Sequence, residues 1–445
     1  MTRLVVASLA ASLTLAPVLG LRGGLALPPA SVAQGSDSTA MYTVGGVRVI
    51  HRRARVATVV TNLYLLGGVR NTPARIAGLE ALLLEASGRG TAKYSRDALR
   101  RALARTGSEM VVEPREDWTM IGARAIPAAL DSTWSILADR VMRPRLDSAE
   151  VEFVRAQMLT GVAQRDDSPD AVLEYAVDSV AFAGAAYAQS PVGTPRTISA
   201  ITRADLLRFQ REQMVTSRML LVVVGDVDRP TVERLVTTTL GTLPAGTYTW
   251  TMPDTLASPV PDAAIIARAL PTNYIQGEFR GPPANSADAT ALRVASAVLS
   301  GRLFGEIRSK RNLTYAVSAN YRDRALTSVG LYVTTTEPDS VLSIMLGELR
   351  TLQVVEVRTE ALRPIVQQFI TEYFLSHETS TAQADFLARA HLYRGDFRAG
   401  SRFVAELRSV TGADVRRVSQ RYFRNARWAY VGDPSQVTKQ RMLNF

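Results

Sequence analysis

The stretch AITRADLLRFQREQM, residues 200–214, occurs in a second, diverged copy, and this repetition decides the fold. Residues 409–423 read SVTGADVRRVSQRYF, and apolar positions match along both segments. The two copies also share a threonine and, three residues later, an aspartate at an offset of 209 positions: Thr202 with Thr411, and Asp205 with Asp414. Threonine is a preferred N-cap residue, so each copy predicts an amphipathic helix that begins at its threonine.

An apolar strand ending in Gly-Asp follows each predicted helix, at 219–226 and 428–433. A period near 200 residues is too long for a solenoid repeat and indicates a duplicated domain. The segment 241–262 is rich in Pro, Gly, Thr and Ser, which is linker composition. We therefore predict an N-terminal domain over 38–240 and a C-terminal domain over 263–440.

Within each half, alternating strand and helix patterns predict an α+β domain, a sheet covered by helices. The 445 residues are 47% hydrophobic, enough for such cores. Cysteine is absent, which excludes disulfides, thiol catalysis and cysteine zinc sites. The net charge of +11 comes mainly from arginines spread among acids along predicted helices, a pattern that argues against a nucleic-acid surface.

The N-terminal segment 1–33 has the pattern of a secretory signal peptide. Arg3 precedes an apolar run, and the small-residue sequence Ser31-Val32-Ala33 forms a cleavage site. An uncleaved membrane anchor is the alternative, because the run is just long enough to span a bilayer. The sequence predicts a periplasmic or secreted protein, with no membrane span once the signal is removed.

Four segments resemble the M16 family of zinc metallopeptidases, the group of insulinase, pitrilysin and mitochondrial processing peptidase. They are YLLGGVRNTP (64–73), GLEALLLEASGRGT (78–91), the long segment 167–214 and LSGRLFGEIRSKRNLTYAV (299–317). The resemblance covers about residues 40–435. It implies two similar M16-type domains, each a mostly antiparallel sheet covered by helices, in a clam-like arrangement.

Active members of that family carry His-x-x-Glu-His on a helix, which we expect here over residues 74–87. That spacing puts two imidazoles and one carboxylate on one helix face, where they bind zinc and activate water. The aligned positions in this chain are Ala81, Leu84 and Glu85. A methyl and an isobutyl group cannot bind zinc or accept a proton, and a single carboxylate is a poor zinc site.

The remaining metal-ligand positions are also compromised. The family's third ligand, a glutamate, falls near residues 160–162, which read Thr-Gly-Val, and Glu150 and Glu152 lie about ten residues too early. The histidines have no mutual ligand spacing: His51, His377 and His391. We expect no catalytic zinc in this chain by itself and no cofactor of its own.

A second element of the family is an Arg and a Tyr in the C-terminal domain that hold the substrate carbonyl. They match Arg308 and Tyr315, whose guanidinium and phenol are both hydrogen-bond donors. The resemblance therefore implies a non-catalytic subunit that places these two residues beside the zinc of a catalytic M16 partner. By the same analogy the strand 118–125 would be the sheet edge that binds an extended peptide substrate.

Two other readings stay open. One is a structural or binding protein of the M16 type with no role in proteolysis. The other is an autonomous hydrolase built on residual carboxylates such as Glu85, Glu113 and Glu116. Whether the chain belongs to an active enzyme is left undecided, as are its substrate and its choice between a homodimer and a heterodimer.

Overall fold

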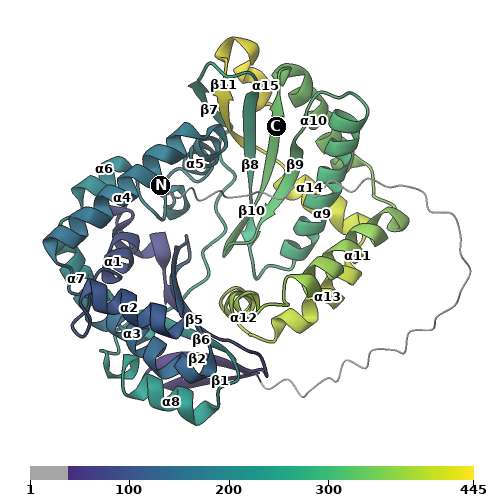
Figure 1. Ribbon diagram of the computed structural model, residues 1–445. Helices are drawn as coiled ribbons and strands as arrows, with labels where there is room; N and C mark the ends of the chain where they lie inside the picture. Colours follow the sequence, from purple (N-terminus) through teal and green to yellow (C-terminus); the bar gives the residue numbers. More distant parts are fainter. Residues whose placement is uncertain (1–38) are drawn as a thin grey trace, which may run out of the picture. The chain divides into compact units, whose positions relative to one another are not determined.

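The computed structural model describes residues 39–445, and the predicted leader at 1–33 lies outside this range. The described residues form two β-sheets with helices packed against both (Figure 1). One sheet is built from the first half of the chain and the other from the second half. No helix in residues 39–445 combines the length and apolar character needed to cross a membrane.

The first sheet has the strand order β1-β2-β6-β3-β5-β4. All neighbours are antiparallel except β2 and β6, which run parallel. The central strands β3 and β6 are buried at every position, as expected for strands covered on both faces. The strands are β1 (Thr39–Val44), β2 (Val47–Arg53), β3 (Val59–Leu66), β4 (Glu109–Pro114), β5 (Trp118–Ala125) and β6 (Met219–Gly225).

The second sheet repeats this plan with the order β7-β11-β8-β10-β9. Its one parallel pair is β7 with β11, and its other neighbours are antiparallel. Both sheets are thus mostly antiparallel, as predicted. The strands are β7 (Asp262–Ala267), β8 (Asn273–Pro283), β9 (Val317–Arg322), β10 (Leu326–Thr335) and β11 (Arg427–Gly432).

The repeated segments form equivalent helices, α7 and α14, directly before the strands β6 and β11. Both begin with the same capping box, in which the threonine and the aspartate three residues later bond each other's backbone N–H groups. The predicted pair of helices beginning at Thr202 and Thr411 is therefore confirmed.

The helices of the two halves follow in matching order. Those of the first half are α1 (Leu79–Ser87), α2 (Arg96–Thr106), α3 (Leu130–Met142), α4 (Ser148–Asp167), α5 (Pro169–Ala181), α6 (Pro195–Ala200), α7 (Arg203–Gln213) and α8 (Arg229–Thr237). Those of the second half are α9 (Asp288–Leu303), α10 (Pro338–Val354), α11 (Thr359–Leu375), α12 (Ser380–Arg394), α13 (Ala399–Ser409), α14 (Gly412–Tyr422) and α15 (Lys439–Leu443).

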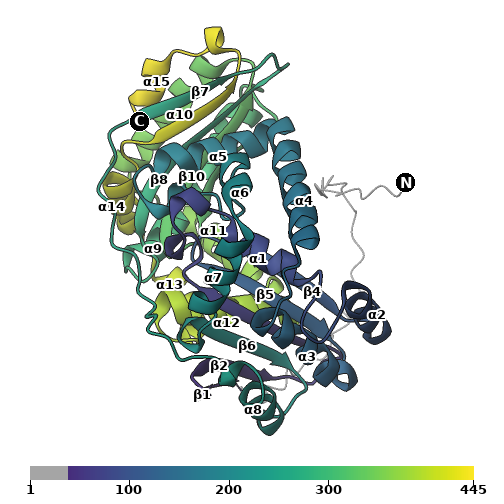
Figure 2. The same ribbon diagram turned by 90° about the vertical axis from the view of Figure 1, so that its left-hand side faces the viewer.

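Each half also covers the sheet of the other half with one helix (Figures 1 and 2). Helix α5, from the first half, packs on β8 and β11, where Leu173 and Val177 meet Val431. Helix α12, from the second half, packs on β3 and β6, with Leu387 and Ala388 in the shared core. The hydrophobic core therefore runs across the boundary between the halves.

The segment between the halves, Leu243–Pro261, has neither helix nor strand, yet it is attached to the structure. Tyr248 and Trp250 pack against the core shared by α12 and the first sheet. The Trp250 indole N–H donates to the Leu392 carbonyl at 2.9 Å. Linker composition at this position thus corresponds to an irregular but packed segment.

Candidate functional site

Helix α1 carries the positions that the sequence analysis aligned with a zinc motif, and in the structure it is a core helix. The predicted helix 74–87 begins later than expected, because residues 74–76 form a separate 3₁₀ turn. Ala81 and Leu84 are 2% and 1% exposed, so the two positions are filled by buried apolar groups. Within residues 39–445 no group of three His, Cys, Asp or Glu side chains is placed to hold a metal ion. The side chains on α1 do not fit a zinc ion.

Glu85 is exposed and lies next to a buried arginine at the end of α1. Partial burial raises the pKa of Glu85, and the nearby positive charge of Arg140 opposes this shift. Arg140 donates to the Leu84 carbonyl at 2.8 Å and to the Ser87 hydroxyl at 3.1 Å. Its guanidinium thus binds the carbonyl end of the helix, where a cation also interacts favourably with the helix dipole.

The acid with the most elaborate environment on α1 is Glu80, which the sequence analysis missed. Its side chain is buried and forms an ion pair with the fully buried Arg218 at 3.0 Å. The Thr119 hydroxyl donates to the other carboxylate oxygen at 2.8 Å. Arg218 also donates to the Leu66 carbonyl at 2.9 Å, so this cluster ties α1 to the first sheet.

The other candidate ligands are dispersed. Residues 160–162 lie on α4, where Val162 is buried and its two neighbours are exposed. Glu150 is paired with Arg89 at 2.7 Å, and Glu152 with Arg155 at 2.9 Å. The three histidines lie on separate elements: His51 on β2, His377 just after α11 and His391 on α12.

The residual carboxylates named for an autonomous hydrolase, Glu113 and Glu116, follow each other closely in the chain but are each paired with an arginine. Glu113 pairs with Arg115, and Glu116 pairs with Arg324 at 3.4 Å. Neither has a histidine beside it among its described partners. The structure assembles no acid–base pair from them.

Arg308 and Tyr315 lie on the surface in the segment between α9 and β9. The helix continues from α9 into a π-helical turn, Phe304–Ser309, which carries Arg308. The Arg308 guanidinium lies 5.1 Å from the centre of the Phe304 ring, and Arg308 forms no ion pair within the described chain. Tyr315 is 84% exposed just before β9. Both donors are thus available to a molecule outside this chain.

The cations beside Arg308 have a different environment. Lys310 and Arg311 both bind Glu306, and their charges and hydrogen bonds lower the pKa of Glu306 to about 2. These two side chains are engaged within their own turn. Arg308 is therefore distinguished from its neighbours by its lack of an acidic partner.

The prediction that strand 118–125 lies at the edge of its sheet is wrong. Strand β5, which spans Trp118–Ala125, pairs with β3 on one side and with β4 on the other, so it is internal. The edge on that side of the first sheet is β4, which pairs only with β5 and exposes Val111. Backbone N–H and C=O groups on its outer side are the unpaired groups to which a further strand can bond.

The equivalent edge of the second sheet is closed by side chains. Strand β9 is the edge there, and α9 packs along it. The Ser296 hydroxyl donates to the Ala319 carbonyl at 2.9 Å, while the Ser300 hydroxyl accepts from the Ala319 N–H at 3.1 Å. Of these two equivalent edges, β4 is therefore the one open to an added strand.

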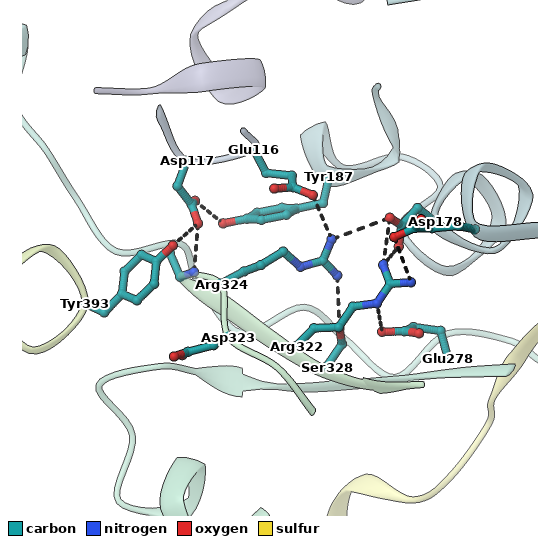
Figure 3. Close-up of polar contacts among 12 residues, drawn as sticks. Glu116, Asp117, Asp178, Tyr187, Glu278, Arg322, Asp323, Arg324, Ser328 and Tyr393 are labelled. Atoms are coloured by element: carbon teal, nitrogen blue, oxygen red, sulfur yellow. Dashed lines mark hydrogen bonds and ion pairs between the residues drawn. The ribbon is translucent and has the colours of Figure 1, made fainter. Parts of the chain in front are cut away.

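A buried polar cluster joins the two halves, and the sequence gives no sign of it (Figure 3). At its centre Asp117, 1% exposed, comes from the turn before β5. Its carboxylate accepts from Tyr187 at 2.5 Å, from Tyr393 at 2.9 Å and from the backbone N–H of Ala325 at 2.8 Å. Two of these donors belong to the second half, so Asp117 fixes α12 and the β9–β10 turn to the first sheet.

Two arginines extend this cluster along the boundary (Figure 3). Arg322 binds both oxygens of Asp178 on α5, at 2.7 and 2.8 Å, and lies 3.6 Å from Glu278. Arg324 reaches Glu116 and donates to the Ser328 hydroxyl at 3.0 Å. Glu278 is fully buried and has no hydrogen-bond partner among residues 39–445, and this burial raises its pKa despite the nearby arginines.

The structure is that of a duplicated two-sheet protein. Each half is a mostly antiparallel sheet with helices, and a core helix stands where the sequence analysis expected the zinc motif. Two family profiles match it: one described as insulinase, peptidase family M16, over residues 48–195, and one described as the peptidase M16 inactive domain, over residues 200–368. The chain belongs to the M16 peptidase family.

Curated relatives match most of the chain at low identity. An uncharacterized zinc protease of Mycobacterium tuberculosis is 25% identical over 402 residues, covering 84% of this chain and 88% of the relative. The mitochondrial cytochrome b-c1 complex subunit 1 of Caenorhabditis elegans is 24% identical over 410 residues, covering 87% and 86%. The chain is thus similar both to a protein named as a protease and to one named as a subunit of a larger complex.

Solved structures show the same fold. A peptidase M16 inactive domain from Pseudomonas fluorescens superposes with a TM-score of 0.81 at 17% identity, covering 89% of this chain and 98% of that one. The periplasmic protease PqqL from Escherichia coli gives 0.72 at 16% identity, covering 94% of this chain and 49% of that one.

Proposed function

We propose that this chain is the non-catalytic subunit of an exported, heterodimeric M16 zinc peptidase. One contrast carries the proposal: two of the three zinc-motif positions, Ala81 and Leu84, are buried and apolar, whereas Arg308 and Tyr315 are exposed and free to act on a neighbour. The zinc and the general base would come from a catalytic M16 partner with an intact His-x-x-Glu-His helix.

In such a complex Arg308 and Tyr315 would contact the peptide substrate at the partner's site. A guanidinium and a phenol both donate hydrogen bonds, which suits the oxyanion that forms when water attacks a peptide carbonyl. Among residues 39–445 no acidic side chain pairs with Arg308, and this supports the role because its charge is not neutralised there.

Strand β4 supports a second contribution, the binding of an extended peptide. An added strand gains main-chain hydrogen bonds from an open edge. The edge of β4 is unpaired, while the equivalent edge at β9 is occupied by serines of α9. We assign peptide binding by this chain to β4, in place of the strand first expected.

Export from the cytoplasm is part of the proposal and is based on the leader at residues 1–33. It agrees with the fold likeness to PqqL, which is described as a periplasmic protease. A periplasmic or secreted location would place the complex where peptides from outside the cell are met.

The test is co-purification from the native host, followed by zinc analysis and peptide hydrolysis for the complex and for each separated chain. We expect zinc in the partner alone, and hydrolysis only when the chains are combined. In the complex, Arg308→Ala and Tyr315→Phe should each lower kcat by about a hundredfold or more, as the loss of an oxyanion donor does. Arg311→Ala, in the same turn but paired with Glu306, is the matched control and should leave turnover unchanged.

The alternative is a structural M16-type protein with no role in proteolysis. The similarity to a cytochrome b-c1 complex subunit favours it, because that relative is named as part of an assembly. The same experiment separates the two. If Arg308→Ala and Tyr315→Phe leave the turnover of an intact complex unchanged, the structural alternative is correct.

A further inference from the structure

The second half contains an aromatic cavity that the proposed function does not use. It has a volume of about 350 Å³ and lies between α11, α12 and the start of α13. This volume falls at the small end of the range for small-molecule sites, which are typically lined by apolar and aromatic groups with a few polar ones. Six aromatic rings line the cavity: Tyr321, Phe369, Tyr373, Phe386, Tyr393 and Phe403.

Contacts among the lining residues hold the aromatic walls in place. The Phe386 ring packs edge-on against Tyr373, with centroids 5.5 Å apart, and against His377 at 4.1 Å. The Tyr373 hydroxyl donates to the Gly400 carbonyl at 3.1 Å. A Cβ atom at Gly400 would lie 1.8 Å from the Phe386 ring, so α13 can approach α12 this closely only with glycine there.

Three arginines belong to the polar part of the lining, and each is oriented by a carboxylate. The other polar side chains there, apart from the tyrosines, are Asp323, Glu372, Ser376 and His377. Arg293 pairs with Asp323 at 2.9 Å and lies over the Tyr321 ring at 4.5 Å. Arg389 donates to Asp385 at 2.7 Å and to the Asp323 backbone carbonyl at 2.7 Å. The third, Arg394, binds Glu406 and the Thr290 hydroxyl.

These contacts leave donors in excess. A guanidinium carries five N–H donors and no acceptor, and the bonds formed here use only part of each set. Of the two carboxylates in the lining, the half-buried Asp323 is already engaged by Arg293, and Glu372 is exposed. The lining therefore matches a ligand that offers acceptor oxygens to the arginines and a ring to the aromatic walls.

We propose that this cavity binds a small aromatic carboxylate. The ring would lie among the side chains of Phe369, Phe386 and Phe403, and the carboxylate would accept from the free N–H groups of the arginines. The ligand would also touch Tyr393, whose hydroxyl binds Asp117 of the first sheet. The same chemistry is offered by a free aromatic acid and by a peptide that ends in an aromatic residue.

The experiment is calorimetric titration of the full mature chain with three probes that share one ring: phenylacetate, 2-phenylethanol and phenethylamine. Phenylacetate should bind the most tightly and phenethylamine the least. Saturable binding of none of them, or binding of phenethylamine as tight as that of phenylacetate, would overturn the proposal.

Variants test the assigned groups. Arg394→Gln should weaken phenylacetate by about tenfold, the value of one hydrogen bond to a charged group, and leave 2-phenylethanol unchanged. The matched control is Arg302→Gln, which removes an arginine paired with Glu348 away from the cavity and should change neither probe. Equal affinity of phenylacetate for the wild type and Arg394→Gln would contradict the proposal.

A second variant and a peptide series complete the test. Ala390→Leu adds three carbon atoms to the cavity wall and should abolish binding of every probe, with circular dichroism confirming the fold. Undiminished binding to the folded variant would place the ligand elsewhere. Among peptides, Ala-Ala-Phe should bind more tightly than its C-terminal amide if a peptide end is the natural source. If phenylacetate binds and neither peptide does, the site takes a free acid.

Discussion

Replacement of Asp117 by alanine tests how the two halves are held together. The carboxylate is buried and accepts four hydrogen bonds, from Tyr187 at 2.5 Å, Tyr393 at 2.9 Å, the Ala325 N–H at 2.8 Å and Arg70 at 3.5 Å, and the Tyr393 and Ala325 donors belong to the second half. Without it, two tyrosine hydroxyls, one backbone N–H and the Arg70 guanidinium lose a charged acceptor inside the protein. Removing one partner of such a buried cluster costs about 3–5 kcal/mol of unfolding free energy.

Urea unfolding followed by far-UV circular dichroism measures this loss, with Asp254→Ala as the control, an exposed aspartate of the linker. Tyr393→Phe should cost about 1 kcal/mol, because it removes a single hydrogen bond across the boundary. A loss below about 1 kcal/mol for Asp117→Ala, or one equal to that of Asp254→Ala, would refute the view that this carboxylate joins the halves.

The remaining predictions concern stability as well. Leu84→Glu, which restores the family's general-base residue, should cost several kcal/mol in thermal or chemical unfolding, because it buries a carboxylate in the core; a neutral effect would mean that this turn of α1 is not a core turn. Glu278→Gln should be more stable than the wild type by a margin that grows with pH. Burial raises the pKa of Glu278 in the folded chain above its ordinary value of 4.5. At pH values between 4.5 and the raised pKa, Glu278 keeps its proton in the folded protein and has lost it in the unfolded chain, so wild-type stability falls as pH rises. Parallel pH profiles of the wild type and Glu278→Gln would contradict this. Thr202→Ala and Thr411→Ala should each cost about 1 kcal/mol, since each removes one of two matching helix caps; a cost confined to one of them would contradict their equivalence.

Much of the fold follows from local patterns in the sequence. The threonine caps of α7 and α14 and the apolar strands β6 and β11 could be predicted because their signals are short-range. Strand β1 was missed although the Gly45-Gly46 turn before β2 is a hairpin signal, with φ angles of 54° and 82° that favour glycine. The predicted start of α1 was too early because residues 74–76 form a separate 3₁₀ turn before the helix.

The wrong edge strand shows what local patterns leave out. Strand β5 is buried at nearly every position, which reflects neighbours on both sides, whereas β4 alternates exposed and half-buried residues. Strand pairing depends on tertiary packing, and no single segment encodes it. The exchange of α5 and α12 between the halves is of the same kind, because an apolar helix face does not specify which sheet it covers.

The candidate site divides in the same way. The positions Ala81, Leu84 and Glu85 come from the resemblance of residues 78–91 to the zinc helix of the M16 family, and the structure adds which of them are buried. The ion pair of Glu80 with Arg218 joins residues 138 positions apart. The boundary cluster around Asp117 likewise joins residues up to 276 positions apart. Such contacts exist only once the chain has folded.

Zinc content and peptide hydrolysis of this chain alone, compared with the complex, test the central claim most directly. With apolar groups at two positions of the α1 motif, the purified chain should contain far less than one zinc per molecule and hydrolyse no peptide, while adding the catalytic partner should restore chelator-sensitive hydrolysis. One zinc per chain together with chelator-sensitive hydrolysis in the partner's absence would contradict the account.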